Sequence, residues 1–105
     1  MAKVADPFYK NKRWLRKREV VLRKNEYLCK ESKQYGRRVA AEFVHHIYPR
    51  DKYPELAYEE WNLLPVTNKI HNTFHDREND EVIGRGLYWQ QKRKREFDRF
   101  YNSPP

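Results

Sequence analysis

All four histidines of the chain lie between positions 45 and 75, and their spacing could build a metal site. His71 and His75 are four residues apart in a segment with helical features, so both rings project from one face. Two imidazoles placed in this way can bind one divalent ion. His45 and His46 are neighbours at the end of an expected strand, where adjacent side chains point to opposite sides. One of them can therefore join the metal while the other faces a separate group, such as a water molecule.

Each feature alone has an ordinary structural explanation. A histidine pair at i and i+4 is more often a solvated helix face than a metal site. Asn62, taken by itself, is more often a turn or cap residue. A structural zinc finger is disfavoured because such sites use two to four cysteines and Cys29 is the single cysteine. The informative feature is the combination of two strand-end histidines, an asparagine before a strand that Pro65 interrupts, and two histidines on the next helix.

Sequence patterns predict the elements that must position these residues. Asp6 before Pro7 resembles a helix N-cap, and Thr67 is expected to cap a later helix. In chain order, we expect a helix over 14–24, a strand over 39–44 continued by 47–48, a short helix over 54–60, a strand over 62–66, and helices over 68–77 and 87–101. Gly84 and Gly86 are expected to break the chain, and Trp89, Phe97 and Phe100 to form the buried stripe of the last helix.

The composition limits the classes of protein to consider. A chain of 105 residues corresponds to one domain. No apolar run approaches the ~18–20 residues that span a bilayer, and no signal-peptide segment follows Met1. A single cysteine allows no intramolecular disulfide, so we expect a cytoplasmic protein without a membrane partner. Sixteen aromatic residues indicate a packed core despite a charged fraction of 36%.

The charge is unevenly distributed along the chain. The formal net charge is +8, with +9 in residues 1–38, −4 in 39–80 and +3 in 81–105. Basic segments of this kind are typical of nucleic-acid contact, because each neutralised phosphate releases counterions. Charge alone is equally consistent with lysines and arginines that only solvate helix faces and contact no nucleic acid. The slightly acidic middle segment is the one that carries the histidines.

The histidine segment resembles the HNH endonucleases, a family with the ββα-metal (His-Me finger) fold. The matching segments are Val44-His45-His46-Ile47-Tyr48-Pro49, Trp61-Asn62-Leu63, and Asn68-Lys69-Ile70-His71-Asn72 followed by His75. The letters of the family name fall on His46, Asn62 and His71. The order is also similar to that in the nuclease domains of DNase colicins. A weaker likeness to short phage and prophage HNH proteins extends back through Phe8-Tyr9, Trp14 and Tyr27-Leu28-Cys29.

The resemblance implies an α+β fold and a role for each motif residue. A single nuclease domain over 1–105 would contain the motif at 45–75, between basic helical flanks at 7–25 and 87–101. His46 would be the general base that activates water, and Asn62 would hold the loop that orients His46. In other branches of the family this asparagine is itself a metal ligand. The ligands of one divalent ion would be His45, His71 and His75.

The ion and the phosphate contacts are less specified. Histidine ligands suit Zn, Ni, Co or Mn better than Mg, whose preferred ligands are oxygens. Cationic side chains that could contact phosphate are Arg37, Arg38, Arg50 and Lys69, each of which could equally be solvated surface. No base-reading motif is visible.

The chain departs from the family pattern at a second metal site. Many members carry two Cys-x-x-Cys pairs that hold a structural zinc. Here the corresponding segments read Cys29-Lys30-Glu31-Ser32 and Thr67-Asn68-Lys69-Ile70, so three of four thiols are missing. We therefore expect no structural zinc and a buried, apolar role for Cys29. The lost stabilisation is expected to come from aromatic packing of the terminal helices, through Trp14, Trp89, Phe97 and Phe100.

Three functions fit these residues. The first is a metal-dependent DNA endonuclease of phage or prophage origin, acting on double-stranded DNA and assisting the packaging terminase, in the bacterial host cytoplasm. The alternative is a non-catalytic DNA-binding or packaging-accessory protein that keeps the HNH fold. A third is an RNA-directed or toxin-like nuclease with the same site.

Overall fold

The structure is a computed structural model that describes residues 6–102. Its elements, with η for 3-10 helices, are η1 (Pro7–Lys10), α1 (Lys12–Lys24), α2 (Lys30–Gln34), β1 (Phe43–His46), η2 (Pro54–Leu56), η3 (Glu60–Asn62), β2 (Leu63–Val66), α3 (Asn68–Thr73), α4 (Arg85–Lys92) and α5 (Lys94–Asn102). The mixed α+β class predicted from the sequence is confirmed. β1, β2 and α3 form a strand-strand-helix unit that carries His45, His46 and His71, and His75 follows α3, which ends at Thr73 rather than at the expected residue 77.

The two strands pair antiparallel, from Phe43 opposite Val66 to His46 opposite Leu63. Just past the strands, the Ile47 N–H donates to the Asn62 carbonyl at 2.8 Å. Because antiparallel bonds alternate along a strand, the backbone groups of Val44 and His46 point away from β2. Pro65 lies opposite Val44, a position that sends no N–H toward β1, so proline is tolerated there.

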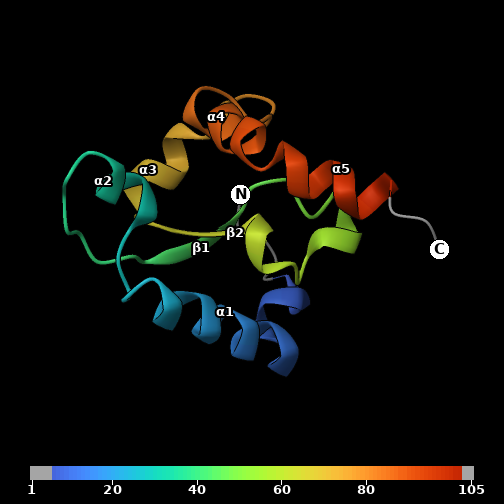
Figure 1. Cartoon of the computed structure of the whole chain (residues 1–105), viewed down its shortest axis with the longest axis horizontal. Helices are drawn as coiled ribbons and strands as arrows, with labels where there is room; N and C mark the ends of the chain where they lie inside the picture. The colour runs from blue at the N-terminus through green and yellow to red at the C-terminus, as the bar shows by residue number, and fades with distance from the viewer. Residues whose placement is uncertain (1–5, 103–105) are drawn as a thin grey trace.

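Helices cover both sides of this sheet (Figure 1). On one side α1 packs Trp14, Val21 and Leu22 against Val44 and Leu63. A second apolar cluster lies on the other side and includes Ile47, Leu64, Val66, Phe74 and Trp89. Burial of this apolar surface is the main stabilising contribution to the fold. The strands are thereby held between α1 and the α3–α4 segment.

Capping side chains fix where the helices begin. Asp6 accepts a hydrogen bond from the Phe8 N–H at 2.9 Å, and Thr67 accepts one from the Ile70 N–H at 3.1 Å. Both predicted caps are confirmed. Asn11 caps α1 by accepting from the Trp14 N–H at 2.7 Å. That cap was not predicted, and it explains why α1 begins two residues earlier than expected.

Several boundaries differ from the sequence-based expectation. β1 begins at Phe43 rather than at residue 39, and the expected helix over 54–60 is a pair of 3-10 turns. Gly84, with φ of 53°, does break the chain, but Gly86 lies inside α4. A Cβ at Gly86 would come within 2.9 Å of the Phe74 carbonyl, so this glycine permits close packing of the helix.

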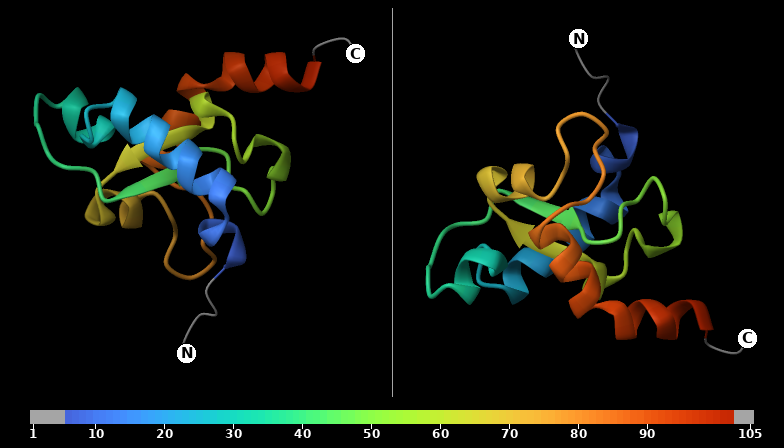
Figure 2. Two further views of the ribbon diagram at one scale, coloured as in Figure 1. Left: turned by 90° about the horizontal axis from the view of Figure 1, so that it is seen from below. Right: turned by 90° about the horizontal axis from the view of Figure 1, so that it is seen from above.

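The expected long helix over 87–101 is divided at Arg93 into α4 and α5. Trp89 is fully buried and Phe97 packs against the larger apolar cluster, but Phe100 is 38% exposed. The prediction of a buried Phe100 was therefore wrong, because the break rotates α5 relative to α4 and continues the helix away from the body (Figure 2). No helix among residues 6–102 is long and apolar enough to cross a membrane.

Candidate active site

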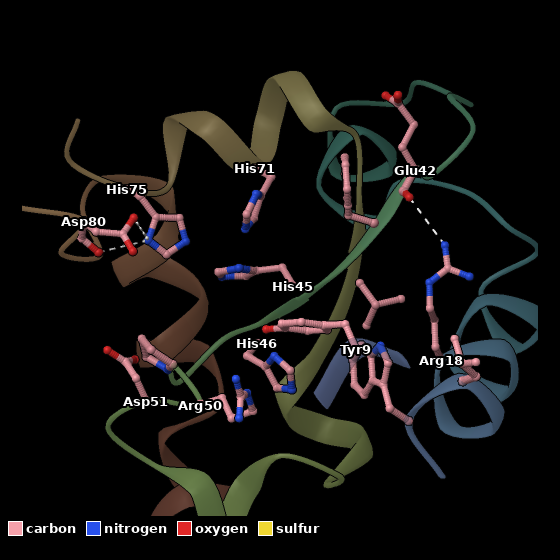
Figure 3. A pocket seen from close by; sticks show the side chains of 15 residues that line it. Tyr9, Arg18, Glu42, His45, His46, Arg50, Asp51, His71, His75 and Asp80 are labelled. Atoms are coloured by element: carbon pink, nitrogen blue, oxygen red, sulfur yellow. Dashed lines mark hydrogen bonds and ion pairs between the residues drawn. The ribbon is translucent and has the colours of Figure 1, made fainter. Parts of the chain in front are cut away.

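Three of the four histidines converge in a single cluster. His45 comes from β1, His71 from α3 and His75 from the turn that follows α3. The three ring pairs have centroid separations of 5.1–5.3 Å. One nitrogen from each ring lies within 4.8 Å of the others. Figure 3 shows the three side chains pointing toward one another. Strand alternation places His45 on this face of β1, and the turn after α3 brings His75 beside His71.

The buried member of the cluster lacks a protein partner. His45 is 3% exposed, and its Nε2 is buried without a hydrogen-bond partner among the described residues. An unpartnered buried nitrogen is costly unless a ligand satisfies it. Burial, followed by the neighbouring His71 and His75, lowers the pKa of His45 well below its usual value. Imidazole nitrogens that face one point are a donor set that suits a divalent transition metal, so these residues fit such an ion.

A loop fixes the orientation of the third histidine. His75 Nδ1 lies 3.3 Å from the Asp80 backbone carbonyl and 3.7 Å from its carboxylate. A carbonyl can only accept, so Nδ1 carries the proton and Nε2 keeps its lone pair. Asp80 itself has a φ of 59°, in the left-handed region. The loop after α3 therefore sets the tautomer that suits a metal ligand.

His46 lies on the other face of β1. Its ring stacks on Trp14, with centroids 5.0 Å apart and an angle of 27°. Its Nε2 donates to the Ala57 carbonyl at 3.1 Å, which leaves Nδ1 with the free lone pair of a base. Burial lowers the pKa of His46 to about 4, and the nearby Arg50 adds to this, while the bond to Ala57 opposes it. The ring is therefore neutral at physiological pH.

Asn62 is fully buried and all of its hydrogen bonds are made to backbone. Its Oδ1 accepts from the Tyr48 N–H at 2.7 Å, and its Nδ2 donates to the Tyr48 and Leu56 carbonyls, both at 3.2 Å. These bonds tie the end of β1 to the segment that carries Ala57. Since Ala57 holds the His46 ring, Asn62 positions His46 indirectly. Its oxygen points to backbone, away from the histidine cluster.

Both histidine faces open into one cavity of about 750 Å³. The cavity is lined by 15 residues, among them all four histidines, Tyr9, Trp14, Arg18 and Arg50. Arg50 forms an ion pair with Asp6 and lies over the Phe8 ring at 4.3 Å. Its buried Nε has no hydrogen-bond partner among residues 6–102. Of the four predicted phosphate contacts, Arg50 is the one in this cavity.

The other three predicted cations lie elsewhere. Arg37 lines a second, smaller hollow that α2 and α3 share, and exposed Arg38 is 3.6 Å from Glu26. Lys69 is exposed on α3 and is absent from the lining of the main cavity. The structure therefore places only one of the four beside the histidines.

Sequence reasoning did not place several cavity residues at the site, among them Tyr9, Arg18 and Asp80. Tyr9 is 44% exposed, with its ring 6.2 Å from that of His46. Arg18 and Asp80 also line the cavity. Their contact with the site depends on how α1 and the loop after α3 pack, which no local pattern reveals. Tyr9 did carry a signal, since Phe8-Tyr9 belongs to the weaker family likeness.

Comparison with known proteins identifies the family. Among solved structures, the chain is similar to the HNH endonuclease of the deep-sea thermophilic bacteriophage GVE2, crystallised with a manganese ion. The two sequences are 31% identical, and the match covers 62% of this chain and 71% of that one with a TM-score of 0.60. The chain belongs to the HNH endonuclease family. For this HNH protein, a scan of protein-family models and a comparison with curated proteins gave no match.

Membership of the HNH family gives the cavity a general interpretation. The similar phage protein supports nuclease activity, and its manganese ion supports a metal-dependent site. The histidine cluster of the present HNH protein is a group that could hold such an ion. The fold class and the family expected from the sequence are therefore confirmed.

Proposed function

We propose that this protein is a metal-dependent endonuclease that hydrolyses phosphodiester bonds in DNA. The observation that carries the proposal is the convergence of two histidine functions on one cavity from opposite faces of β1. His45 joins His71 and His75 on one face, and His46 stands alone on the other. Together they supply the two requirements of phosphodiester hydrolysis, a base for water and positive charge beside the phosphate.

His46 acts as the general base through Nδ1. Its Nε2–H is held by the Ala57 carbonyl, so the ring is fixed in one tautomer. Stacking on Trp14 fixes the plane of the ring. Asn62 supports this arrangement by holding the backbone on both sides of the site, which makes it a positioning residue. The proton from water passes to Nδ1, the hydroxide attacks phosphorus, and the bond from phosphorus to the 3′-oxygen breaks. The leaving 3′-oxygen takes a proton from water.

His45, His71 and His75 would hold one divalent ion. When bound, such an ion supplies Lewis-acid stabilisation to the phosphate and to the leaving 3′-oxygen. The three nitrogen donors favour Zn, Ni, Co or Mn over Mg. Arg50 adds a fixed cation to the same cavity, with an unpartnered Nε–H that can donate to a phosphate oxygen.

The proposed substrate is double-stranded DNA, and the proposed setting is assistance to a phage packaging terminase. The phage origin of the similar structure supports this setting. RNA is tested in parallel, because the site chemistry does not distinguish the two nucleic acids. Adding a purified terminase to the cleavage assay tests the partner.

The function is tested by nicking of supercoiled plasmid after the protein has been stripped of metal. Mg, Mn, Co, Ni and Zn are added back singly to the wild type, to His75→Ala and to Asn72→Ala. Asn72 is exposed on α3 beside His71 and serves as the matched control. We expect ion-dependent nicking by the wild type and by Asn72→Ala, and none by His75→Ala. Salt-sensitive DNA binding without cutting under every ion would instead support the accessory-protein alternative.

A further inference from the structure

The cavity continues beyond the histidines as a groove along the free edge of β1. The sheet of the described residues has two strands. β2 covers one edge of β1, and among residues 6–102 no strand pairs with the edge that presents the backbone of Val44 and His46. One wall of this groove comes from α1 and the other from α3 and the turn after it; their lining residues are Trp14, Leu15, Arg18, His71 and His75.

Apolar side chains are exposed within this groove. Leu15 is 48% exposed and Phe43 is 45% exposed. The Phe43 ring lies 6.1 Å from the His71 ring at an angle of 28°. The apolar surface is therefore continuous with the histidine cluster. Flat apolar surface beside a phosphate-cleaving site suits the face of a sugar or a base.

The end of the groove away from Arg50 carries a second cation. Arg18 donates to the Glu42 carbonyl through a single long bond of 3.5 Å (Figure 3), which leaves other guanidinium N–H groups for a ligand. Two acidic side chains of the groove contact groups other than Arg18. Glu42 accepts from the Asn68 N–H at 3.2 Å, and Asp80 lies against His75. Asp51 lies near Arg50, at the opposite end.

The length of the groove suits a short stretch of one strand. The backbone from Glu42 to the end of β1 at His46 extends ~13 Å at ~3.3 Å per residue. Stacked nucleotides rise ~3.4 Å each and an unstacked strand extends further, so this length holds about two to four nucleotides.

We propose that this groove binds the nucleotides that flank the scissile phosphate, with Arg18 on a flanking phosphate. Leu15 and Phe43 then contact the adjoining sugar and base. The inference rests on the proposed function, because it places one strand of the DNA along β1 with its scissile phosphate at His46. An extended peptide pairing with the free strand edge is the competing occupant. A cation with free donors at the end of the groove favours the phosphate.

The first test is binding without catalysis. A fluorescent DNA duplex is titrated with metal-stripped protein in EDTA over a range of salt concentrations. Arg18→Ala is compared with Arg18→Lys and with Arg16→Ala, which removes an exposed cation of α1 outside the groove. We expect Arg18→Ala to weaken binding about tenfold and to reduce the salt slope by ~1, as the loss of one phosphate contact does. Arg18→Lys should keep most of the slope.

The apolar wall of the groove is tested by one variant and a control of matched exposure. Leu15→Ala removes a groove side chain that is 48% exposed, and Leu87→Ala removes one on α4 that is 50% exposed. We expect only Leu15→Ala to weaken binding of the duplex, by about threefold to tenfold, on the scale of a lost stacking or apolar contact. Equal effects of the two variants would overturn the assignment of this wall.

The second test is cleavage of two substrates by the metal-loaded protein. Bis(p-nitrophenyl) phosphate contains a diester but no flanking nucleotides. The loss caused by Arg18→Ala should be about tenfold larger on the duplex than on this small diester, and should appear in KM. Equal losses on both substrates, or equal effects of Arg18→Ala and Arg16→Ala on binding, would overturn the inference. If the wild type cleaves neither substrate, the proposed function fails and the binding experiment alone decides the groove.

Discussion

The protein contains two buried polar clusters that differ in one respect. Glu31 is 4% exposed, and both of its carboxylate oxygens accept hydrogen bonds. Its carboxylate accepts from Arg85 Nε at 2.9 Å, from Arg85 Nη2 at 2.8 Å and from Trp89 Nε1 at 3.3 Å. Around His45, which is buried to a similar degree, Nε2 has no partner among residues 6–102.

The difference indicates which cluster serves the fold and which serves a ligand. The Glu31 cluster joins α2 to α4 and is complete within the protein. Glu31 belongs to the Cys29-Lys30-Glu31-Ser32 segment, which the family resemblance matched to a Cys-x-x-Cys pair. Cys29 Sγ there accepts from the Ser32 N–H at 3.4 Å. The Glu31 carboxylate is thus satisfied by Arg85 and Trp89, whereas His45 Nε2 has no partner among the described residues.

The largest expected effect on stability comes from removing the carboxylate of the Glu31 cluster. Glu31→Ala leaves Arg85 and the buried Trp89 Nε1–H without their acceptor. Because the Arg85 side chain is 36% exposed and water can reach it, we expect a cost of about 3 kcal/mol, the upper end for a buried polar group left unsatisfied. We expect the free energy of unfolding, measured in urea, to fall by about that amount. Glu78→Ala, at an exposed position in the loop after α3, is the control. A change below about 1 kcal/mol for Glu31→Ala would mean that the cluster does not hold α2 to α4.

The second expected effect comes from filling the incomplete cluster. A divalent ion at 100 times its Kd should stabilise the metal-free protein by about 2.7 kcal/mol, since it binds the folded state alone. We expect Mn or Zn to raise the thermal midpoint of the wild type, as this stabilisation requires. The midpoint of His75→Ala should not rise with either ion. The same rise in His75→Ala would show that the ion binds elsewhere.

A third prediction concerns pH. The Tyr48 hydroxyl donates to the Gln90 carbonyl at 2.7 Å, and burial raises the pKa of Tyr48 to about 12. Because the folded pKa lies above the unfolded value of about 10, this contribution is intact below pH 10 and is lost as pH rises through 12. Stability of the wild type should therefore fall more steeply between pH 10 and 12 than that of Tyr48→Phe. Parallel curves in denaturant titrations would contradict this.

The smallest expected effect sets a baseline for both clusters. Lys94 and Asp98 form an exposed i,i+4 pair at 3.1 Å on α5. Exposed pairs of this kind contribute about 0.3–0.5 kcal/mol. Asp98→Ala should change the free energy of unfolding by no more than this, and the change should vanish in high salt. A salt-independent loss larger than about 1 kcal/mol would contradict the account. It would show that the exposed Lys94–Asp98 pair stabilises the protein about as much as the pair formed by buried Glu31.

Local patterns predicted much of this arrangement. Alternation along β1 separated His45 from His46, and helical spacing paired His71 with His75. Thr67 and Asp6 were found as caps because capping is a short-range interaction. The Glu31–Arg85 pair was not predicted, since its residues are 54 positions apart. Arg18, Asp80 and the stacking of Trp14 on His46 likewise depend on tertiary packing. Phe100 was misassigned because no sequence feature indicated the break at Arg93.

The most direct test of the central claim separates metal binding from cutting in one variant. His46→Ala leaves the three clustered histidines intact and removes the base. With Mn added to stripped protein, thermal stabilisation and plasmid nicking are measured on the same sample. We predict wild-type stabilisation by the ion together with nicking slowed by ~10²–10⁴, as expected for loss of a general base. Nicking at the wild-type rate by His46→Ala would contradict the account.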